Sequence, residues 1–106
     1  YQKPQKMCDR INTVGYEADV FISPDERYII FCSLREDGLG EGDLYISFKE
    51  DGVWCQAINM GESINSEGHE LCPFVTDDGK YFFYTSNKDI YWVDAGIIES
   101  YRNNNL

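Results

Sequence analysis

The feature that most constrains this chain is an internal repeat. Residues 17–33, with the sequence EADVFISPDERYIIFCS, return as residues 70–86, ELCPFVTDDGKYFFYTS, so equivalent positions lie 53 residues apart. In each copy a short apolar strand enters a tight acidic turn, and a strongly apolar strand leaves it. Self-similarity with a period of this size indicates a repeat architecture, in which each repeat is one supersecondary unit.

The repeat extends beyond this hairpin in both directions. Identical residues separated by 53 positions include the pairs Met7/Met60, Ile11/Ile64, Asn12/Asn65, Glu17/Glu70 and Ser33/Ser86. After position 33 the spacing falls from 53 to 46, because the sequence DLYI at 43–46 matches DIYW at 89–92. The first copy is therefore seven residues longer, and the extra residues fall in the Gly-rich acidic segment 34–42, as expected for a surface loop.

The apolar runs are short and separated by turn signals, which predicts strands. Pro24-Asp25-Glu26 is a turn sequence, and Asp51-Gly52 is typical of a hairpin. Residues 28–32 are apolar at every position, the pattern of a strand covered on both faces. We predict an all-β fold with two repeats per chain, each forming a four-stranded antiparallel sheet of the size and pattern of a β-propeller blade.

The repeat boundaries define the predicted organisation. We treat 1–106 as a single β-propeller segment made of 1–16 (the outer strand of a preceding blade and a loop), 17–58 (blade 1), 59–69 (a connection), 70–94 (a partial blade 2) and 95–106 (a C-terminal tail with a short helix). Residues 1–7 and 53–58 are each expected to form one strand. The predicted core contains Phe21, Ile22, Tyr28, Ile29, Ile30, Phe31, Leu44, Tyr45, Ile46, Phe74, Val75, Tyr81, Phe82, Phe83, Tyr84, Ile90, Tyr91 and Trp92.

The composition argues against two classes of partner. The chain has 19 acidic and 9 basic residues and a net charge of −10, whereas binding to nucleic acid needs clustered Lys and Arg. No apolar run approaches the roughly 20 residues that cross a bilayer, so we expect no membrane insertion. The acidic surface is either a solvated face that aids solubility, or a face for a cationic partner or a divalent metal.

The four cysteines form no CxxC pair, and with a single histidine they provide no zinc-ligand set. Cys32 and Cys72 lie in apolar strands, where a free thiol behaves as a small hydrophobic group. We therefore expect buried free thiols, and a Cys32–Cys72 disulfide is the alternative.

The acidic segment between the strands of the first repeat is a candidate calcium site. Asp37, Glu41 and Asp43 provide carboxylates among glycines, and calcium prefers several oxygen ligands on a flexible loop. The spacing of an EF-hand loop is missing. The alternative is a solvated loop that binds nothing, and we expect no other cofactor.

Five further residues lie at strand starts or turns. Glu17 and Glu70 begin equivalent strands, Asp25 and Asp78 occupy equivalent turns, and His69 precedes Glu70. Because a repeated residue usually serves the repeat, we interpret the two glutamates as structural hydrogen-bond acceptors. A carboxylate ring around a central channel is the alternative. We interpret His69 as a packed or loop-capping residue, because no nucleophile motif such as GxSxG accompanies it, and we expect no enzyme activity.

Several motifs are distributed over nearly the whole chain. They are Ser23-Pro24-Asp25-Glu26, Asp43-Leu44-Tyr45, Asp51-Gly52-Val53-Trp54, and Asn65-Ser66 followed by Glu70 and Pro73. Together they resemble the WD40-like or PD40 β-propeller repeat of TolB-like propellers. The chain departs from that pattern at Glu26, where Gly is usual, at Thr76-Asp77, where Ser-Pro is usual, and at His69-Glu70, where Asp-Glu is common.

The resemblance implies a non-catalytic module for protein binding or assembly, periplasmic or extracytoplasmic in bacteria, although this chain carries no signal peptide. The alternatives are a fragment of a propeller from a larger protein, such as a prolyl-oligopeptidase-like peptidase, and a glycan- or calcium-binding propeller. Two blades leave their outward apolar faces without neighbours, so we expect the chain to assemble with copies of itself. TolB-like propellers have six blades, which makes a trimer the expected state, with residues 1–7 of one copy completing the last blade of its neighbour.

Overall fold

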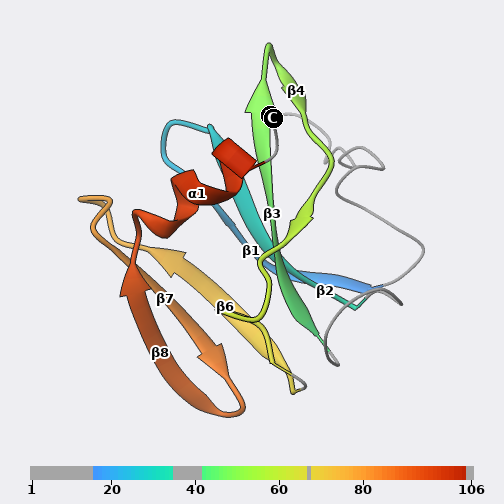
Figure 1. Cartoon of the computed structure of the whole chain (residues 1–106), viewed down its shortest axis with the longest axis vertical. Coiled ribbons are helices and arrows are strands. Elements are labelled where there is room, and N and C mark those ends of the chain that lie inside the picture. Colours follow the sequence, from blue (N-terminus) through green and yellow to red (C-terminus); the bar gives the residue numbers. More distant parts are fainter. Residues whose placement is uncertain (1–15, 35–41, 67, 105–106) are drawn as a thin grey trace, which may run out of the picture.

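The computed structural model describes residues 16–34, 42–66 and 68–104, and it consists mainly of antiparallel strands in two sheets (Figure 1). The first sheet contains β1 (Tyr16–Ile22), β2 (Tyr28–Leu34), β3 (Asp43–Glu50), β4 (Val53–Trp54) and β5 (Ile58–Asn59). The second sheet contains β6 (Glu70–Val75), β7 (Tyr81–Ser86) and β8 (Asp89–Asp94), and α1 (Ile97–Asn104) follows it. The prediction of an all-β fold is confirmed. The strand expected at 1–7 lies outside the described residues.

The sequence repeat is also a repeat of backbone geometry. The strand order β1-β2-β3 in the first sheet returns as β6-β7-β8 in the second. In both, the first strand pair shifts register at a bulge, and the bulges contain Asp19 and Cys72, which lie 53 positions apart. Both residues have left-handed backbone angles, with φ of 47° and 52°. Cys72 is therefore exposed, and the expectation that it is buried is wrong, because the bulge turns this position out of the ladder.

The two hairpin turns are equivalent in atomic detail, as predicted. Ser23 Oγ donates a hydrogen bond to Asp25 Oδ1 at 2.8 Å, and Thr76 Oγ1 donates to Asp78 Oδ1 at 2.6 Å. Each carboxylate also accepts the backbone amide two residues later, at 3.2 and 3.0 Å. These hydroxyl bonds favour the ionised carboxylates and hold the pKa of both Asp25 and Asp78 below its usual value. Asp25 and Asp78 thus shape the turns.

Each sheet has two faces that can be compared between the repeats. We call forward the face that carries Tyr28, Ile30, Cys32, Leu44 and Ile46 in the first sheet and the equivalent Tyr81, Phe83, Thr85, Ile90 and Trp92 in the second. We call rear the opposite face, which carries Ile29, Phe31 and Tyr45 in the first sheet and Phe82, Tyr84 and Tyr91 in the second. These assignments follow from the cross-strand pairs, whose members share a face.

The main core lies between the forward face of the first sheet and the rear face of the second. Ile30, Leu44 and Ile46 are buried there against Phe82 and Tyr84. Among the strands of the second sheet, β6 lies nearest the first sheet, and β8 lies on the far side (Figure 1). The two repeats therefore stack with unlike faces in contact.

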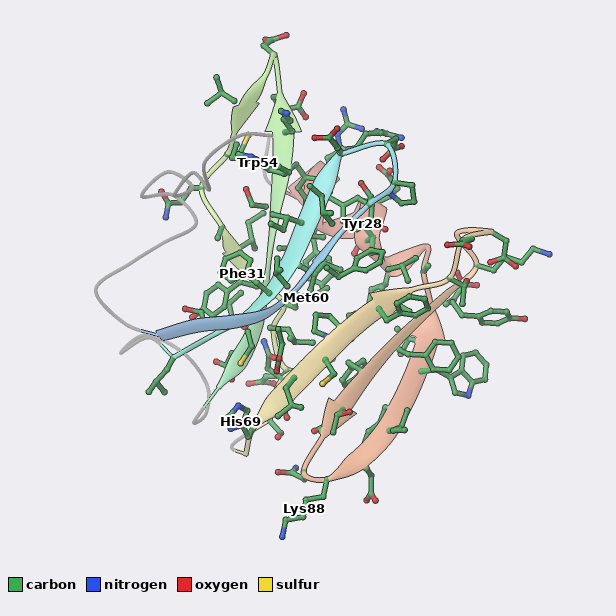
Figure 2. All side chains as sticks on the ribbon, turned by 180° about the vertical axis from the view of Figure 1, so that it is seen from behind. Tyr28, Phe31, Trp54, Met60, His69 and Lys88 are labelled. Carbon is green, nitrogen blue, oxygen red and sulfur yellow. The ribbon has the colours of Figure 1, made fainter. Side chains whose placement is uncertain are left out.

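The rear face of the first sheet is also covered. Ile29, Phe31 and Tyr45 are buried there, with Trp54 and Ala57 packed against them. Figure 2 shows Phe31 and Trp54 on this side and Met60 between the two sheets. Strand β2 is thus buried on both faces, as its unbroken apolar run predicts.

On the second sheet the core prediction is confirmed for Val75, Phe82 and Tyr84 and is wrong for five other residues. Phe74, Tyr81, Ile90, Tyr91 and Trp92 are exposed. Phe74, Tyr81, Ile90 and Trp92 lie on the forward face of the second sheet, which no described sheet or helix covers. Tyr91 lies on the rear face of β8, the strand farthest from the first sheet. Ile22, also predicted as core, is exposed on β1, whereas Phe21, Tyr28 and Phe83 are half-buried. The core instead contains residues outside the prediction, namely Cys32, Phe48, Met60, Ile64, Ala95 and Ile98.

Residues 53–58 form two short strands instead of the expected one. β4 pairs with β3 through Trp54 and Lys49, whereas β5 pairs with β3 through Ile58 and Ile46. Trp54 and Ile58 are four residues apart, whereas their partners on β3, Lys49 and Ile46, are three residues apart. One extra residue must be accommodated, so the ladder is interrupted.

The C-terminal helix connects the two sheets. Ile98 is buried in the core between them, and the Tyr101 hydroxyl donates a hydrogen bond of 2.6 Å to the Met60 carbonyl. Arg102 Nε lies 3.3 Å from Glu50 Oε1, but this pair is half-exposed and contributes little. In the parts of the chain that the structure describes, no helix combines the length and apolar content needed to cross a membrane.

We expect removing the glycine of one turn and adding a glycine to the other to change the free energy of unfolding in opposite directions. Gly79 has φ of +71°, and Glu26, at the equivalent position, has φ of 58°. We expect Gly79→Val to lower the free energy of unfolding by about 1 kcal/mol or more, because a β-branched residue is strained in this region. We expect Glu26→Gly to raise it by about 0.5 kcal/mol, since relief of strain exceeds the entropy cost of glycine. Urea unfolding of both variants measures the signs, and equal signs would contradict equivalent turns.

Candidate functional site

Glu70 is a fully buried carboxylate at the start of β6, and its bonds are structural. Its Oε1 accepts the Ser66 amide at 3.0 Å, and its Oε2 accepts the hydroxyls of Ser66 and Ser86 at 2.7 and 2.6 Å. The carboxylate thus ties the loop before β6 to the end of β7, which fits the structural interpretation. Glu17 pairs with Ser33 across β1 and β2, just as Glu70 pairs with Ser86 across β6 and β7. The side chain of Glu17 is not among the side chains that the structure describes.

A chain of amide side chains fastens the connection between the repeats to β3. Asn65 Oδ1 accepts the Leu44 amide at 2.7 Å, and Asn65 Nδ2 donates to the Leu44 carbonyl at 3.0 Å. Asn65 Nδ2 also donates to Asn59 Oδ1 at 2.9 Å. The side chain of Asn65 therefore satisfies both backbone groups of Leu44, as a neighbouring strand would. We call this arrangement the Asn65 clasp.

The sequence analysis did not assign this role to Asn65. The available signal was that Asn12 recurs as Asn65, and that each asparagine lies five positions before a repeated glutamate, Glu17 or Glu70.

Asp43 belongs to the same network. It is buried at the start of β3, and its Oδ2 accepts a hydrogen bond of 3.0 Å from Asn59 Nδ2. The other two candidate calcium ligands, Asp37 and Glu41, lie outside the described residues. Within the described ranges, no group of three or more His, Cys, Asp or Glu side chains is placed to hold a metal ion. Calcium binding by the loop stays a prediction.

His69 packs against the first sheet, as expected for a packed residue. Its Nε2 lies 3.7 Å from Cys32 Sγ, and a Cβ on Gly42 would lie 2.8 Å from two atoms of its ring. Burial raises the pKa of the Cys32 thiol to about 11, so the thiol is protonated at neutral pH. Because the thiolate is the nucleophile in cysteine chemistry, this pair is poorly suited to catalysis. Cys32 and Cys72 carry free thiols.

An acidic groove runs between the two turns and α1. Its lining includes the carboxylates Asp25, Asp77, Asp78 and Glu99. Asp25 and Asp78 are already bonded within their turns, and Glu99 Oε1 lies 3.9 Å from Arg27 Nη2. The groove has the charge to attract a cation, but its carboxylates are engaged in local contacts.

The forward face of the second sheet gathers several of the large apolar side chains that are exposed in the described chain. Ile90 and Trp92 on β8 project from it, and the Tyr81 ring meets the Trp92 ring edge-on at 5.4 Å between centroids. The outer edge of β8 is open as well, since no described strand pairs with it. This surface, with its aromatic rings and open backbone groups, is the best candidate for binding a partner.

The buried carboxylate makes a stability prediction. We expect Glu70→Gln to lower the free energy of unfolding by about 2 kcal/mol, because an amide cannot accept all three hydrogen bonds that the carboxylate accepts. Glu62→Gln is the matched control, since Glu62 is exposed in the same connection. Urea unfolding measures both. An equal, small effect of the two substitutions would contradict the structural role of Glu70.

Burial of Cys32 makes a reactivity prediction. We expect iodoacetamide to modify the exposed Cys72 at pH 8 much faster than Cys32 in the folded protein. Because the pKa of Cys32 is raised to about 11, its thiolate fraction should become substantial only as the pH approaches that value. Peptide mapping by mass spectrometry measures the two rates. Rapid modification of Cys32 at pH 8 would show that the thiol is activated.

Comparison of the chain with protein-family models, with curated proteins and with solved structures found no match in any of the three. The likeness to the PD40 repeat accordingly depends on the sequence motifs, and the propeller arrangement belongs to the proposal that follows.

Proposed function

We propose that this chain is a non-catalytic module of the PD40, TolB-like propeller kind, which assembles by stacking a further sheet of the same repeat on the forward face of its second sheet. One observation carries the proposal. Leu44 and Ile46 on the first sheet are 0 % exposed beneath the second sheet, whereas Ile90 and Trp92 at the equivalent positions are 76 % and 61 % exposed. The second sheet thus presents to solvent the surface that the first sheet buries.

The chemistry of this surface supports a protein partner. Large aromatic and aliphatic side chains such as Trp92, Tyr81 and Ile90 are the residues that dominate the energetics of protein interfaces. A contiguous exposed apolar face is unusual for a soluble monomer. Within one chain, the rear face of the second sheet packs on the forward face of the first sheet. This observed contact shows how a partner sheet would pack on the equivalent forward face of the second sheet.

The proposed partner is a second copy of this chain, which would offer its first sheet. Contacts between unlike faces are heterologous, and they close into a ring when the rotation between units closes. Three copies would then form the six-bladed ring that the resemblance implies.

The structure differs from one assumption behind the expected self-assembly. The rear face of the first sheet was expected to be exposed, but Ile29, Phe31 and Tyr45 are buried in the single chain. Stacking between copies therefore requires the side chains that cover this face to move. The alternative function is that of a fragment of a larger propeller, in which the next repeat of the same polypeptide covers the forward face.

Assembly is tested by removing an apolar side chain from the forward face. We expect the wild-type chain to sediment above its monomer mass of 12.3 kDa at micromolar concentration. Ile90→Lys should weaken self-association about 100-fold or more, because a lysine would be buried in the interface without a partner. Val53→Lys is the matched control, since Val53 is also an exposed aliphatic residue but lies on β4. A folded wild-type monomer at this concentration would overturn self-assembly.

A further inference from the structure

The outer edge of β3 shows how this fold closes a sheet. β5 pairs with β3 through Tyr45 and Asn59, and the Met60 amide donates a hydrogen bond of 3.0 Å to the Leu44 carbonyl. The Asn65 clasp then bonds both backbone groups of Leu44. Met60 and Ile64, between these polar contacts, are buried in the core. Residues 54–65 therefore act together as a closing segment for the edge of β3.

The equivalent edge on the second sheet is open. Ile90 and Tyr91 on β8 correspond to Leu44 and Tyr45 on β3, but no described strand pairs with their outer edge. Because the Leu44 amide points to the Asn65 clasp, the Ile90 amide is expected to point outward in the same way. An apolar strand with an open edge is a template for pairing with another segment.

The chain contains a second copy of the closing segment. Residues 1–12 match 54–65 at the spacing of 53, with Tyr1 for Trp54, Met7 for Met60, Ile11 for Ile64 and Asn12 for Asn65. We propose that residues 1–12 of a second copy of the chain close the edge of β8, and that Asn12 forms on Ile90 the clasp that Asn65 forms on Leu44. This inference depends on the proposed assembly and identifies the segment that would hold it together.

The direction of the chain requires that the segment come from another copy. At the junction of the two repeats, Glu70 lies five positions after Asn65 and begins β6, which lies on the forward side of the first sheet. A segment clasped to β8 through Asn12 would likewise place Glu17 on the forward side of the second sheet. In the same chain, however, β1 belongs to the first sheet, which lies on the rear side of the second sheet.

Charge favours this occupant over a second copy of 54–65. Residues 1–12 contain Lys3, Lys6 and Arg10 and a single acidic residue, so they carry a net charge of +2 within a chain of net charge −10. β8 begins at Asp89 and ends at Asp94, and both carboxylates are exposed. Opposite charges on the segment and on β8 would speed encounter and favour this pairing.

The clasp is tested in the full chain by sedimentation equilibrium. We expect Asn12→Ala to weaken self-association about 10-fold or more, because it removes two hydrogen bonds from an interface. Gln2→Ala is the control, since position 2 corresponds to Cys55, which bonds to β3 through its backbone amide and carbonyl and not through its side chain. An unchanged association constant for Asn12→Ala would overturn the clasp. If Ile90→Lys still abolished association in that case, the assembly surface would stand without the clasp.

A synthetic peptide of residues 1–12 tests binding to the open edge of β8 without relying on the mass of the assembly. We expect the peptide to bind the full chain saturably, to change the fluorescence of Trp92 on β8, and to compete with self-association. A peptide with Asn12→Ala should bind about 10-fold more weakly. A scrambled peptide of the same composition controls for charge attraction, and equal binding by the scrambled and native peptides would overturn the proposal.

Discussion

A strand that is apolar on both faces must be covered on both faces, and the rest of this structure depends on that requirement. The first sheet meets it, since Ile30 and Ile46 pack between the sheets while Ile29 and Phe31 are buried on the opposite side. The second sheet meets it only on its rear face, where Phe82 is buried. The forward face of the second sheet, which carries Trp92, is exposed because this requirement is not met within the described chain.

Polar side chains determine where the apolar sheets can lie. Asn65 bonds both backbone groups of Leu44, and Glu70 gathers hydroxyl and amide donors from Ser66 and Ser86. A buried polar group without partners costs free energy comparable to a lost hydrogen bond, so these bonds select one register and one connection between the sheets. The buried polar side chains of Asn65 and Glu70 therefore serve the structure. This use of the polar groups is one reason why we propose a binding surface as the function.

Much of the local geometry could be predicted from the sequence because short-range physics decides it. The turns at Asp25 and Asp78 repeat a hydroxyl, a carboxylate and a tight reversal within five residues, and the structure reproduces them bond for bond. The bulge at Cys72 could not be predicted, because a left-handed residue without glycine or asparagine leaves no signal in the sequence. The clasp of Asn65 on Leu44 spans 21 positions, so only the folded chain brings its atoms together.

The sequence by itself determined the repeat, most of the described strands, the two equivalent turns and the all-β class, since each depends on periodicity or on neighbours in the chain. Only the tertiary structure decided which apolar face is covered. Leu44 and Ile90 occupy equivalent positions in equivalent strands, yet one is buried and the other exposed. The difference lies in what stacks on each sheet, and burial is a property of the neighbouring sheet that no local pattern of residues records.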